Sequence, residues 1–356
     1  MIVYLPFTNR MNLPEGIEIG GIQLYGYPSL ETDTPKEEPQ KGPINVVFLT
    51  SLRDIAADDR AGTITNIPRG PSYMMGLIEA VNLAIKDCYH NLGDFIKIGG
   101  VITDDLLVTD LTTPLPTYKT SGKQWIYPLE ERTAQGETLG NLTEHIPSTF
   151  RREIDKDERR FKRKEFEEEL YQVSQEMGAD IIISDHLMIK IIYLLHKVKY
   201  GIGKILNIHP GITDPIHPGK LLGATPTMDA IRNAKSLETT FDKDTRLYKP
   251  SIKTGATLHV MGKRVDEGSV IASSGNTKVN SSDRRRDLRY RNYPVKFQVF
   301  VQGIIHYIRT MFPVIDNLDL SERGKMKRVI PFLVDQYREK RPQTPHPILD
   351  RKNPSR

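Results

Sequence analysis

The sequence has a single cysteine, Cys88, among its 356 residues. One cysteine excludes internal disulfides and thiolate metal clusters. Cys88 lies in a segment with helical spacing, residues 73–89, where a buried structural thiol is the simpler interpretation. No apolar run approaches the roughly 18–20 residues that span a bilayer, and residues 1–10 lack a basic region followed by an apolar stretch. The sequence therefore predicts no membrane span and no secretory signal, and we expect a cytoplasmic protein.

The chain also lacks a strong excess of one charge, because 50 Lys and Arg face 45 Asp and Glu, a net charge of +5. Basic and acidic residues are mixed almost everywhere, which argues against a nucleic-acid partner. The only clearly basic run, residues 284–291, fits either a solvated helix start or a contact for an anionic substrate. The nine histidines include no HExxH pair, so we predict no metal site.

Strand-like and helix-like segments alternate along the chain. Residues 44–51 (INVVFLTS) form a continuous apolar run of strand length, residues 73–87 have helical spacing, and residues 95–103 are again strand-like. Further strands are expected at 180–184, 204–208 and 257–261, and further helices at 151–177, 187–196, 224–234 and 294–311. This alternation predicts an α/β fold: an open, mostly parallel twisted sheet with helices on both faces.

Composition divides the chain into three parts. Residues 1–43 combine short apolar runs, read as a small N-terminal β extension, with a proline-rich charged linker at 34–43. Residues 44–311 are expected to form the main domain. Within it, residues 106–150 show no helical or strand periodicity and are expected to be a loop or insertion. Residues 312–356 are expected to form a C-terminal helix and a polar tail.

The segment KILNIHPGITDP, residues 204–215, places polar side chains at the end of an apolar strand. Asn207 and His209 are two residues apart, so they point to the same side of the strand. In open parallel sheets, ligands bind at the carboxyl ends of the strands. We therefore expect Asn207 and His209 to face one site.

A second segment, TGATLHVMGKRVDEGSVI at residues 254–271, leads from a strand into a turn that presents Asp266. Gly262 and Gly268 allow the backbone to bend closely around a flat ligand. An Asn, a His and an Asp on neighbouring strand ends form a general acid–base set with an oxyanion donor.

These two segments together resemble the folate-dependent formyltransferase family, whose pattern is Asn-x-His-Pro followed by a Thr-Gly-x-Thr strand and Asp-x-Gly. The matching positions are Asn207, His209, Pro210, Thr254, Gly255, Thr257, His259, Asp266 and Gly268. The resemblance covers roughly residues 44–310. It is closest to the hydroxyornithine transformylases of siderophore pathways, through residues 184–194, 217–231 and 288–308.

The resemblance implies transfer of a formyl group from 10-formyltetrahydrofolate, the donor co-substrate, to an amine or hydroxylamine nitrogen of a small molecule. Asn207 and protonated His209 are then expected to donate hydrogen bonds to an oxyanion, and Asp266 to hold the charge of His209 and move a proton. The pterin ring is expected to lie against the backbone of two segments, with Met188, Ile189, Lys190, Met261, Lys263 and Val265 as its binding residues.

The sequence departs from the purine-synthesis members of the family after the first strand. Residues 50–73 lack a glycine-serine phosphate loop, and Pro71 removes a backbone donor, so a ribonucleotide acceptor is disfavoured. N5-hydroxyornithine is the favoured acceptor and an amino sugar is the alternative. A formyltetrahydrofolate hydrolase would use the same three residues, but would be expected to carry a regulatory domain larger than residues 1–43. A non-catalytic folate-binding protein is a more remote alternative. The oligomeric state and the pathway stay open.

Overall fold

The computed structural model describes residues 17–19, 22–25, 42–50, 77–88, 92–104, 132–185, 191–198, 205–213, 221, 225–238, 253–262, 266 and 268–311. Nine strands in these ranges form one sheet in the order β1-β2-β9-β8-β7-β6-β3-β4-β5. The strands are β1 (Ile17–Ile19), β2 (Ile22–Leu24), β3 (Ile44–Thr50), β4 (Ile96–Thr103), β5 (Thr143–His145), β6 (Ile181–Asp185), β7 (Ile205–His209), β8 (Lys253–Val260) and β9 (Val270–Lys278).

Five neighbouring strands, β5, β4, β3, β6 and β7, run parallel. All seven residues of β3, INVVFLT, are buried, as expected of a central strand that is covered on both faces. The expected open α/β sheet is confirmed, and the strands predicted at 44–51, 95–103, 180–184 and 204–208 are β3, β4, β6 and β7.

The other four strands are antiparallel. β8 pairs with β7, β9 pairs with β8, and the β1–β2 hairpin joins β9 through Gln23↔Ser273 and Leu24↔Ala272. The expected N-terminal strands are therefore part of the main sheet. β9 was not predicted, because its sequence VIASSGNTK is mostly small and polar and lacks a clear apolar alternation.

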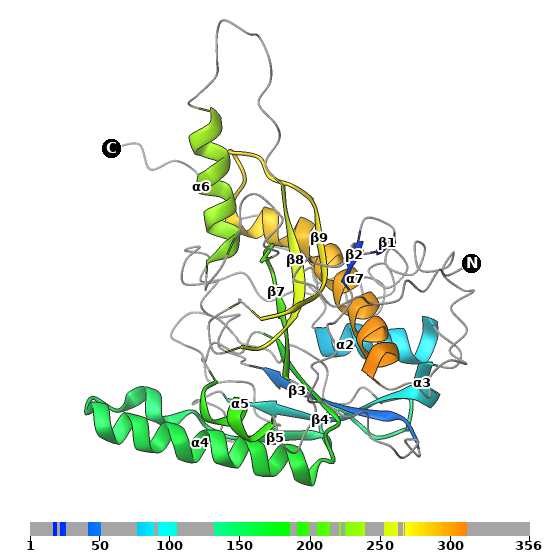
Figure 1. Ribbon diagram of the computed structural model, residues 1–356, viewed down its shortest axis with the longest axis vertical. Helices are drawn as coiled ribbons and strands as arrows, with labels where there is room; N and C mark the ends of the chain where they lie inside the picture. Colours follow the sequence, from blue (N-terminus) through cyan, green and yellow to red (C-terminus); the bar gives the residue numbers. More distant parts are fainter. Residues whose placement is uncertain are drawn as a thin grey trace, which may run out of the picture.

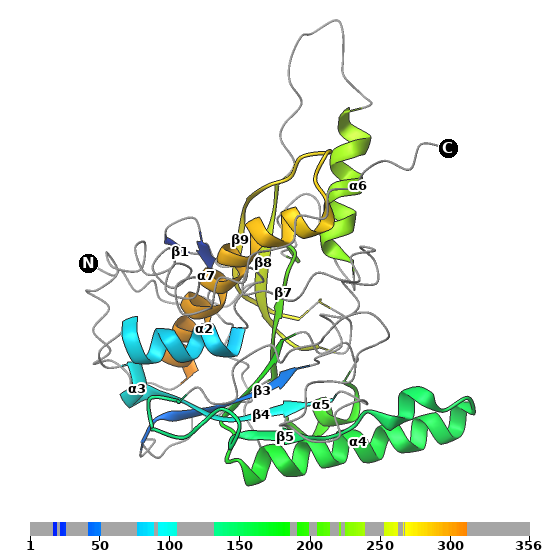
Figure 2. The same cartoon turned by 180° about the vertical axis from the view of Figure 1, so that it is seen from behind.

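Helices cover both faces of the sheet (Figure 1). The helical elements are α2 (Leu77–Leu83), the π-helix η1 (Ala84–Cys88), α3 (Leu92–Phe95), the 3₁₀-helix η2 (Thr149–Arg152), α4 (Lys156–Glu176), α5 (Tyr193–Val198), α6 (Pro226–Glu238) and α7 (Arg285–Met311). α2 and α7 pack on one face, where Phe48 contacts Phe300 with ring centroids 6.3 Å apart. α4 and α5 pack on the other face, through Phe166, Leu170 and Leu194. Figure 2 shows α6 beside the first turns of α7.

Three predicted boundaries differ from the structure. α7 begins at Arg285 instead of residue 294, because Pro294 is typical of a first helical turn yet here lies inside the helix. Part of the expected loop at 106–150 holds β5, a strand of three residues that is too short to give a period. α5 begins only at Tyr193.

A buried carboxylate on α4 determines where α5 starts. Glu167 is fully buried and accepts hydrogen bonds from the backbone N–H groups of Ile192 (2.7 Å), Tyr193 and Leu194 (3.0 Å). Arg163 lies 3.0 Å from the same carboxylate and compensates its charge. Glu167 therefore supplies acceptors to N–H groups at the helix start that have no partner within α5.

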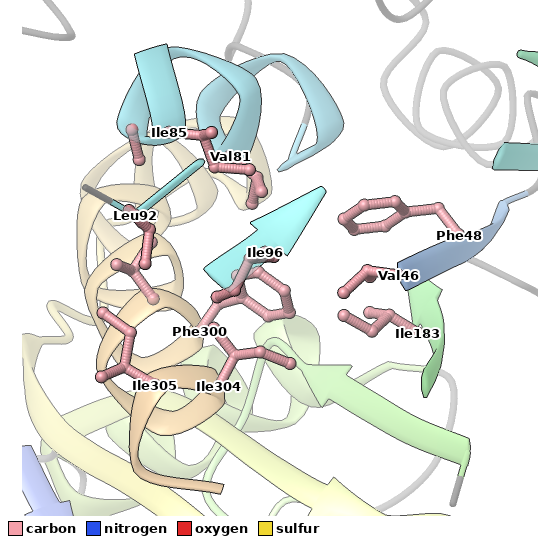
Figure 3. A pocket seen from close by; sticks show the side chains of 12 residues that line it. Val46, Phe48, Val81, Ile85, Leu92, Ile96, Ile183, Phe300, Ile304 and Ile305 are labelled. Atoms are coloured by element: carbon pink, nitrogen blue, oxygen red, sulfur yellow. The ribbon is translucent and has the colours of Figure 1, made fainter. Parts of the chain in front are cut away.

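A cavity lies between the sheet and the helices α2, α3 and α7 (Figure 3). Its lining is wholly apolar and includes Val46, Phe48, Ile183 and Phe300. Without a polar group to orient a ligand it has the character of a packing gap in the core. None of the described helices is both long and apolar enough to cross a membrane.

Candidate active site

The site is organised by the antiparallel pairing of β7 with β8. In this register Asn207 lies opposite His259, and His209 lies opposite Thr257. Directly opposed residues of antiparallel strands project from the same face of a sheet. The four side chains therefore share one face at the end of β7.

Asn207 uses both hydrogens of its side-chain amide. Its Nδ2 lies 3.1 Å from His259 Nε2 and 3.3 Å from Asp266 Oδ1. His259 Nδ1 lies 3.1 Å from the Val260 carbonyl, which can only accept, so Nδ1 carries the hydrogen and Nε2 is an acceptor in the neutral ring. His259 and Asp266 thus fix the orientation of the Asn207 amide.

His209 is also held at both ring nitrogens. Nε2 donates to the Leu221 carbonyl at 2.7 Å, and Nδ1 lies 3.4 Å from Asp266 Oδ2. Burial lowers the pKa of His209 from its ordinary value of 6.5, although the Asp266 carboxylate and the hydrogen bond to Leu221 act in the opposite direction. At neutral pH the ring is therefore uncharged, and Nδ1 faces the carboxylate without a proton.

Asp266 reaches this pair from the connection between β8 and β9, in the turn that the sequence predicted after this strand. Its backbone is left-handed, with φ 55°, and its side chain is buried. Two residues later, a Cβ on Gly268 would lie 1.5 Å from the Val260 carbonyl oxygen. Only glycine fits there, so Gly268 is what allows the connection to return close to β8.

Buried polar side chains hold the chain segments around His209. Thr257 Oγ1 accepts from the Thr213 N–H and donates to the Gly211 carbonyl, each at 3.0 Å. Asn292 of α7 donates to the carbonyls of Gly255 (2.7 Å) and Pro210 (3.4 Å). The turn after His209 is thus fixed both to β8 and to α7.

Comparison with solved structures identifies the fold. PvdF of pyoverdin biosynthesis, an N10-formyltetrahydrofolate-dependent formyltransferase, matches with a TM-score of 0.57 and 28% identity, over 74% of this chain and 98% of that one. This chain has the fold of the folate-dependent formyltransferases. A phosphoribosylglycinamide formyltransferase from Campylobacter jejuni subsp. jejuni (TM-score 0.40, 12% identity, 76% of this chain and 100% of that one) and a formyltetrahydrofolate deformylase from Pseudomonas putida (0.39, 17%, 75% and 66%) also match.

The other two comparisons, a scan against protein-family models and a search of curated proteins, gave no match. The family resemblance that the motifs around Asn207 and Asp266 indicated is thus supported by the solved structures.

The three predicted catalytic residues of the formyltransferase motifs, Asn207, His209 and Asp266, lie together. Of the predicted folate-binding residues, the structure describes Met261. Its side chain is half-buried and packs against the core cluster that α4 and α5 form with the sheet. Its backbone N–H donates to the Ile205 carbonyl at 2.8 Å. The others, Met188, Ile189, Lys190, Lys263 and Val265, lie outside the described residues, and their role stays a prediction.

Sequence reasoning missed how several residues contribute to the candidate site. His259 and Thr257 belong to the recognised strand, but only the antiparallel pairing places them beside Asn207 and His209. Lys296 and Asp185, which form an ion pair, lie in stretches that carry the family resemblance, but neither stretch indicates that the two side chains pair. Among the described residues, no group of three His, Cys, Asp or Glu side chains could hold a metal ion.

One arginine of the basic run, Arg291, has a structural role. It forms an ion pair with Asp283 and donates to the Lys278 carbonyl at 3.1 Å. The run also contains Leu288, which is buried against α6. This part of the run therefore joins α7 to the end of β9.

Proposed function

We propose that this chain transfers a formyl group from 10-formyltetrahydrofolate to an amine or hydroxylamine nitrogen of a small molecule. The observation that carries the proposal is the convergence of Asn207, His209 and Asp266 on one face at the end of β7. The similarity to PvdF, itself an N10-formyltetrahydrofolate-dependent formyltransferase, supports it.

The His209–Asp266 pair suits the proton transfer that this reaction requires. The acceptor nitrogen forms a bond to the formyl carbon as the bond to N10 of the folate breaks, and one proton must pass from the acceptor nitrogen to N10. His209 Nδ1 has no proton when the ring is neutral, and Asp266 lies 3.4 Å away. A proton taken up there is stabilised by the carboxylate.

The side-chain amide of Asn207 can donate a hydrogen bond to the negative charge that develops on the formyl oxygen. Both of its amide hydrogens are engaged with His259 and Asp266. The 3.3 Å contact with Asp266 is the longer of the two, so we expect this hydrogen to be exchanged for the formyl oxygen when substrate binds. Asn207 is half-buried, which leaves it within reach of a ligand.

The folate donor is expected beside Asn207, where Met261 and Gly262 are both half-buried. Backbone N–H and C=O groups can read the polar edge of a flat pterin ring, and apolar side chains can cover its faces. The donor supplies the activated formyl group. The proposed contacts of Met188, Ile189, Lys190, Lys263 and Val265 belong to the same expectation.

The favoured acceptor is N5-hydroxyornithine. PvdF belongs to pyoverdin biosynthesis, and three stretches of this sequence resemble hydroxyornithine transformylases. A hydroxylamine nitrogen is neutral and nucleophilic at pH 7, whereas an ordinary side-chain amine with a pKa near ~10 must first lose a proton. The lowered pKa of His209 makes it a weak base. A weak base suits a hydroxylamine, which carries no extra proton at pH 7, better than an ordinary amine.

The test is a panel assay at one donor concentration with hydroxyornithine, ornithine, glycinamide ribonucleotide and several amino sugars. We expect hydroxyornithine to give the highest kcat/KM. A higher kcat/KM for an amino-sugar nucleotide would exclude the siderophore role but would still support formyl transfer. Formate release that no acceptor increases would identify a hydrolase instead.

Donor binding is measured separately with 5-formyltetrahydrofolate, which should raise the melting temperature through linkage. Formyl-coenzyme A serves as the control donor. Formyl transfer from formyl-coenzyme A, without any folate-dependent shift in melting temperature, would contradict the proposal. A melting shift without turnover on any acceptor would favour a folate-binding protein.

A further inference from the structure

The ring of His209 faces two hydrogen-bond acceptors, one at each nitrogen. Nε2 lies 2.7 Å from the Leu221 carbonyl oxygen, and Nδ1 lies 3.4 Å from Asp266 Oδ2. A neutral imidazole carries one hydrogen, so only one of the two acceptors can bind it. The contact with Leu221 has the length of a good hydrogen bond, whereas the contact with Asp266 is longer than the usual range. The hydrogen is therefore on Nε2, where the Leu221 carbonyl holds it.

The Leu221 carbonyl is itself fixed by the turn that follows β7. Leu221 donates its own backbone N–H to the Ile212 carbonyl at 2.8 Å. Thr257 of β8 fixes the residues on either side of Ile212. Its hydroxyl donates to the Gly211 carbonyl and accepts from the Thr213 N–H, each at 3.0 Å. The acceptor for the ring is thus tied to β8 through this turn.

Gly211 leaves the room that the hydrogen bond of His209 needs. It is buried, and a Cβ added to it would lie 3.0 Å from His209 Nε2 and 3.0 Å from the Leu221 oxygen. The same Cβ would lie 2.7 Å from Cβ of Pro226, the first residue of α6. Heavy atoms in contact normally stay roughly 3.5–4.0 Å apart, so at least one of these three neighbours would have to move. The absence of a side chain allows all three to lie where they do.

The bond to Leu221 decides which ring nitrogen of His209 can take up a proton. Without this bond, the ring hydrogen would move to Nδ1, because a carboxylate such as that of Asp266 binds a donor more strongly than a neutral carbonyl does. The nitrogen without a hydrogen would then be Nε2, on the Leu221 side of the ring. With the bond in place, the basic nitrogen is Nδ1, on the Asp266 side.

We propose that Gly211 is a positioning residue for His209. Its missing side chain lets the Leu221 carbonyl bind Nε2, which leaves Nδ1 as the nitrogen that takes up a proton beside Asp266. In the proposed reaction this proton comes from the acceptor nitrogen as that nitrogen bonds to the formyl carbon, and it passes to N10 as the bond to N10 breaks. That step rests on the proposed function. The position of the ring hydrogen does not, because it can be measured without substrate.

The first measurement uses the wild-type chain. With isotope-labelled histidines, at a pH where the ring is neutral, NMR spectra that correlate ring protons with ring nitrogens show which nitrogen carries the hydrogen. The His209 signals are assigned by their loss in H209N. We expect the hydrogen on Nε2. A hydrogen on Nδ1 would overturn the inference, whatever any variant does.

The second measurement uses G211A, which adds one methyl group against the hydrogen bond. We expect the ring hydrogen of His209 to move to Nδ1. We also expect kcat to fall by roughly 10–10²-fold, because misplacing a catalytic group by about 1 Å has effects of this size. The KM values of donor and acceptor should change little, since the loss concerns the transition state. An unchanged ring hydrogen, or full turnover despite a moved one, would contradict the proposed role.

The matched control is G303A on α7. A Cβ on Gly303 would lie 2.7 Å from Leu258 Cδ2 and 2.9 Å from Ala272 Cβ, so the methyl group is equally crowded, but by apolar side chains. G303A should lower the melting temperature and leave the ring hydrogen and the kcat of the folded fraction unchanged. Melting curves show whether G211A folds. Equal losses of kcat in the two variants would reduce Gly211 to a packing role and overturn the inference.

Two results separate this inference from the proposed function. A ring hydrogen that moves from Nε2 to Nδ1 in G211A, in a chain that transfers no formyl group, would support the role of Gly211 at the ring and remove the formyltransferase assignment. A wild-type hydrogen on Nδ1, in a chain that does transfer formyl groups, would overturn the inference and leave the proposed function intact.

Discussion

The two halves of the sheet bury different chemistry. In the parallel half, the middles of β3 and β6 bury continuous apolar runs, and their buried polar residues, Asn45, Thr50, Ser184 and Asp185, lie near the strand ends. In the antiparallel half, β8 and β9 bury Thr254, Thr257, His259, Ser273, Ser274 and Thr277. α7 packs on both halves, whereas the core cluster of α4 and α5 includes strand residues of the parallel half only.

The contrast reflects a division of tasks. Parallel strands that are covered on both faces must be apolar, since each polar group would need a partner in the core. Antiparallel pairing places opposed side chains on one face, where His259 forms a hydrogen bond with the Asn207 amide. Two of the three proposed catalytic residues, Asn207 and His209, lie on β7, the strand where the two halves meet, with the parallel strands on one side and the polar residues of β8 on the other.

Among the variants that test this comparison of the two halves, H209N is expected to have the largest effect on turnover. It removes the proton acceptor, and turnover should fall by roughly 10²–10⁴-fold while the fold is kept. H306N is the matched control, because His306 on α7 also bonds a backbone carbonyl, that of Tyr25 at 2.8 Å, but lies outside the site. Steady-state assays and melting curves check both. Near wild-type turnover in H209N would remove His209 from the mechanism.

A substitution in the parallel half should act on stability instead. Phe48 is fully buried beside the apolar cavity, and F48A should lower the free energy of unfolding by about 3–5 kcal/mol. The turnover of the folded fraction should change little. Urea unfolding and active-site titration measure the two quantities, with F161A at a half-exposed position of α4 as the control. If F48A lost turnover without losing stability, the proposed division of tasks between the two halves of the sheet would be wrong.

The smallest effect concerns the polar positions of the antiparallel half. T257V keeps the shape but removes the bonds to Thr213 and Gly211, and should cost about 1–3 kcal/mol of stability with a modest loss of turnover. T254V on the same strand is the control, because Thr254 Oγ1 is buried and has no hydrogen-bond partner among the described residues. Equal costs for the two variants in thermal unfolding would show that hydrogen bonding by Thr257 adds nothing.

Local patterns predicted most of the parallel half. β3, β4, β6 and β7 were found because continuous apolar runs of strand length have few other interpretations. β5 and β9 were missed, one because it has three residues and the other because small polar residues carry no period. The start of α7 was misplaced because Pro294 resembles a helix start.

The candidate site divides in the same way. Asn207 and His209 could be placed on one face from their spacing alone, and Asp266 could be recognised from its motif. The contacts of Leu221 with His209 and of Asn292 with Gly255 could not be predicted, since they join residues that are not neighbours in the chain. The local sequence around each of them contains no sign of the partner.

By itself, the sequence determined the α/β class, four of the five parallel strands and the three residues of the formyltransferase motifs, because apolar runs and motif spacing are local properties. Only the tertiary structure decided that β8 runs antiparallel to β7, that Asp266 has a left-handed backbone, and that Lys296 of α7 pairs with Asp185 at the end of β6. These features depend on pairing and packing between distant segments. The partners of His209, the Leu221 carbonyl and Asp266, come from such distant segments, which no local pattern specifies.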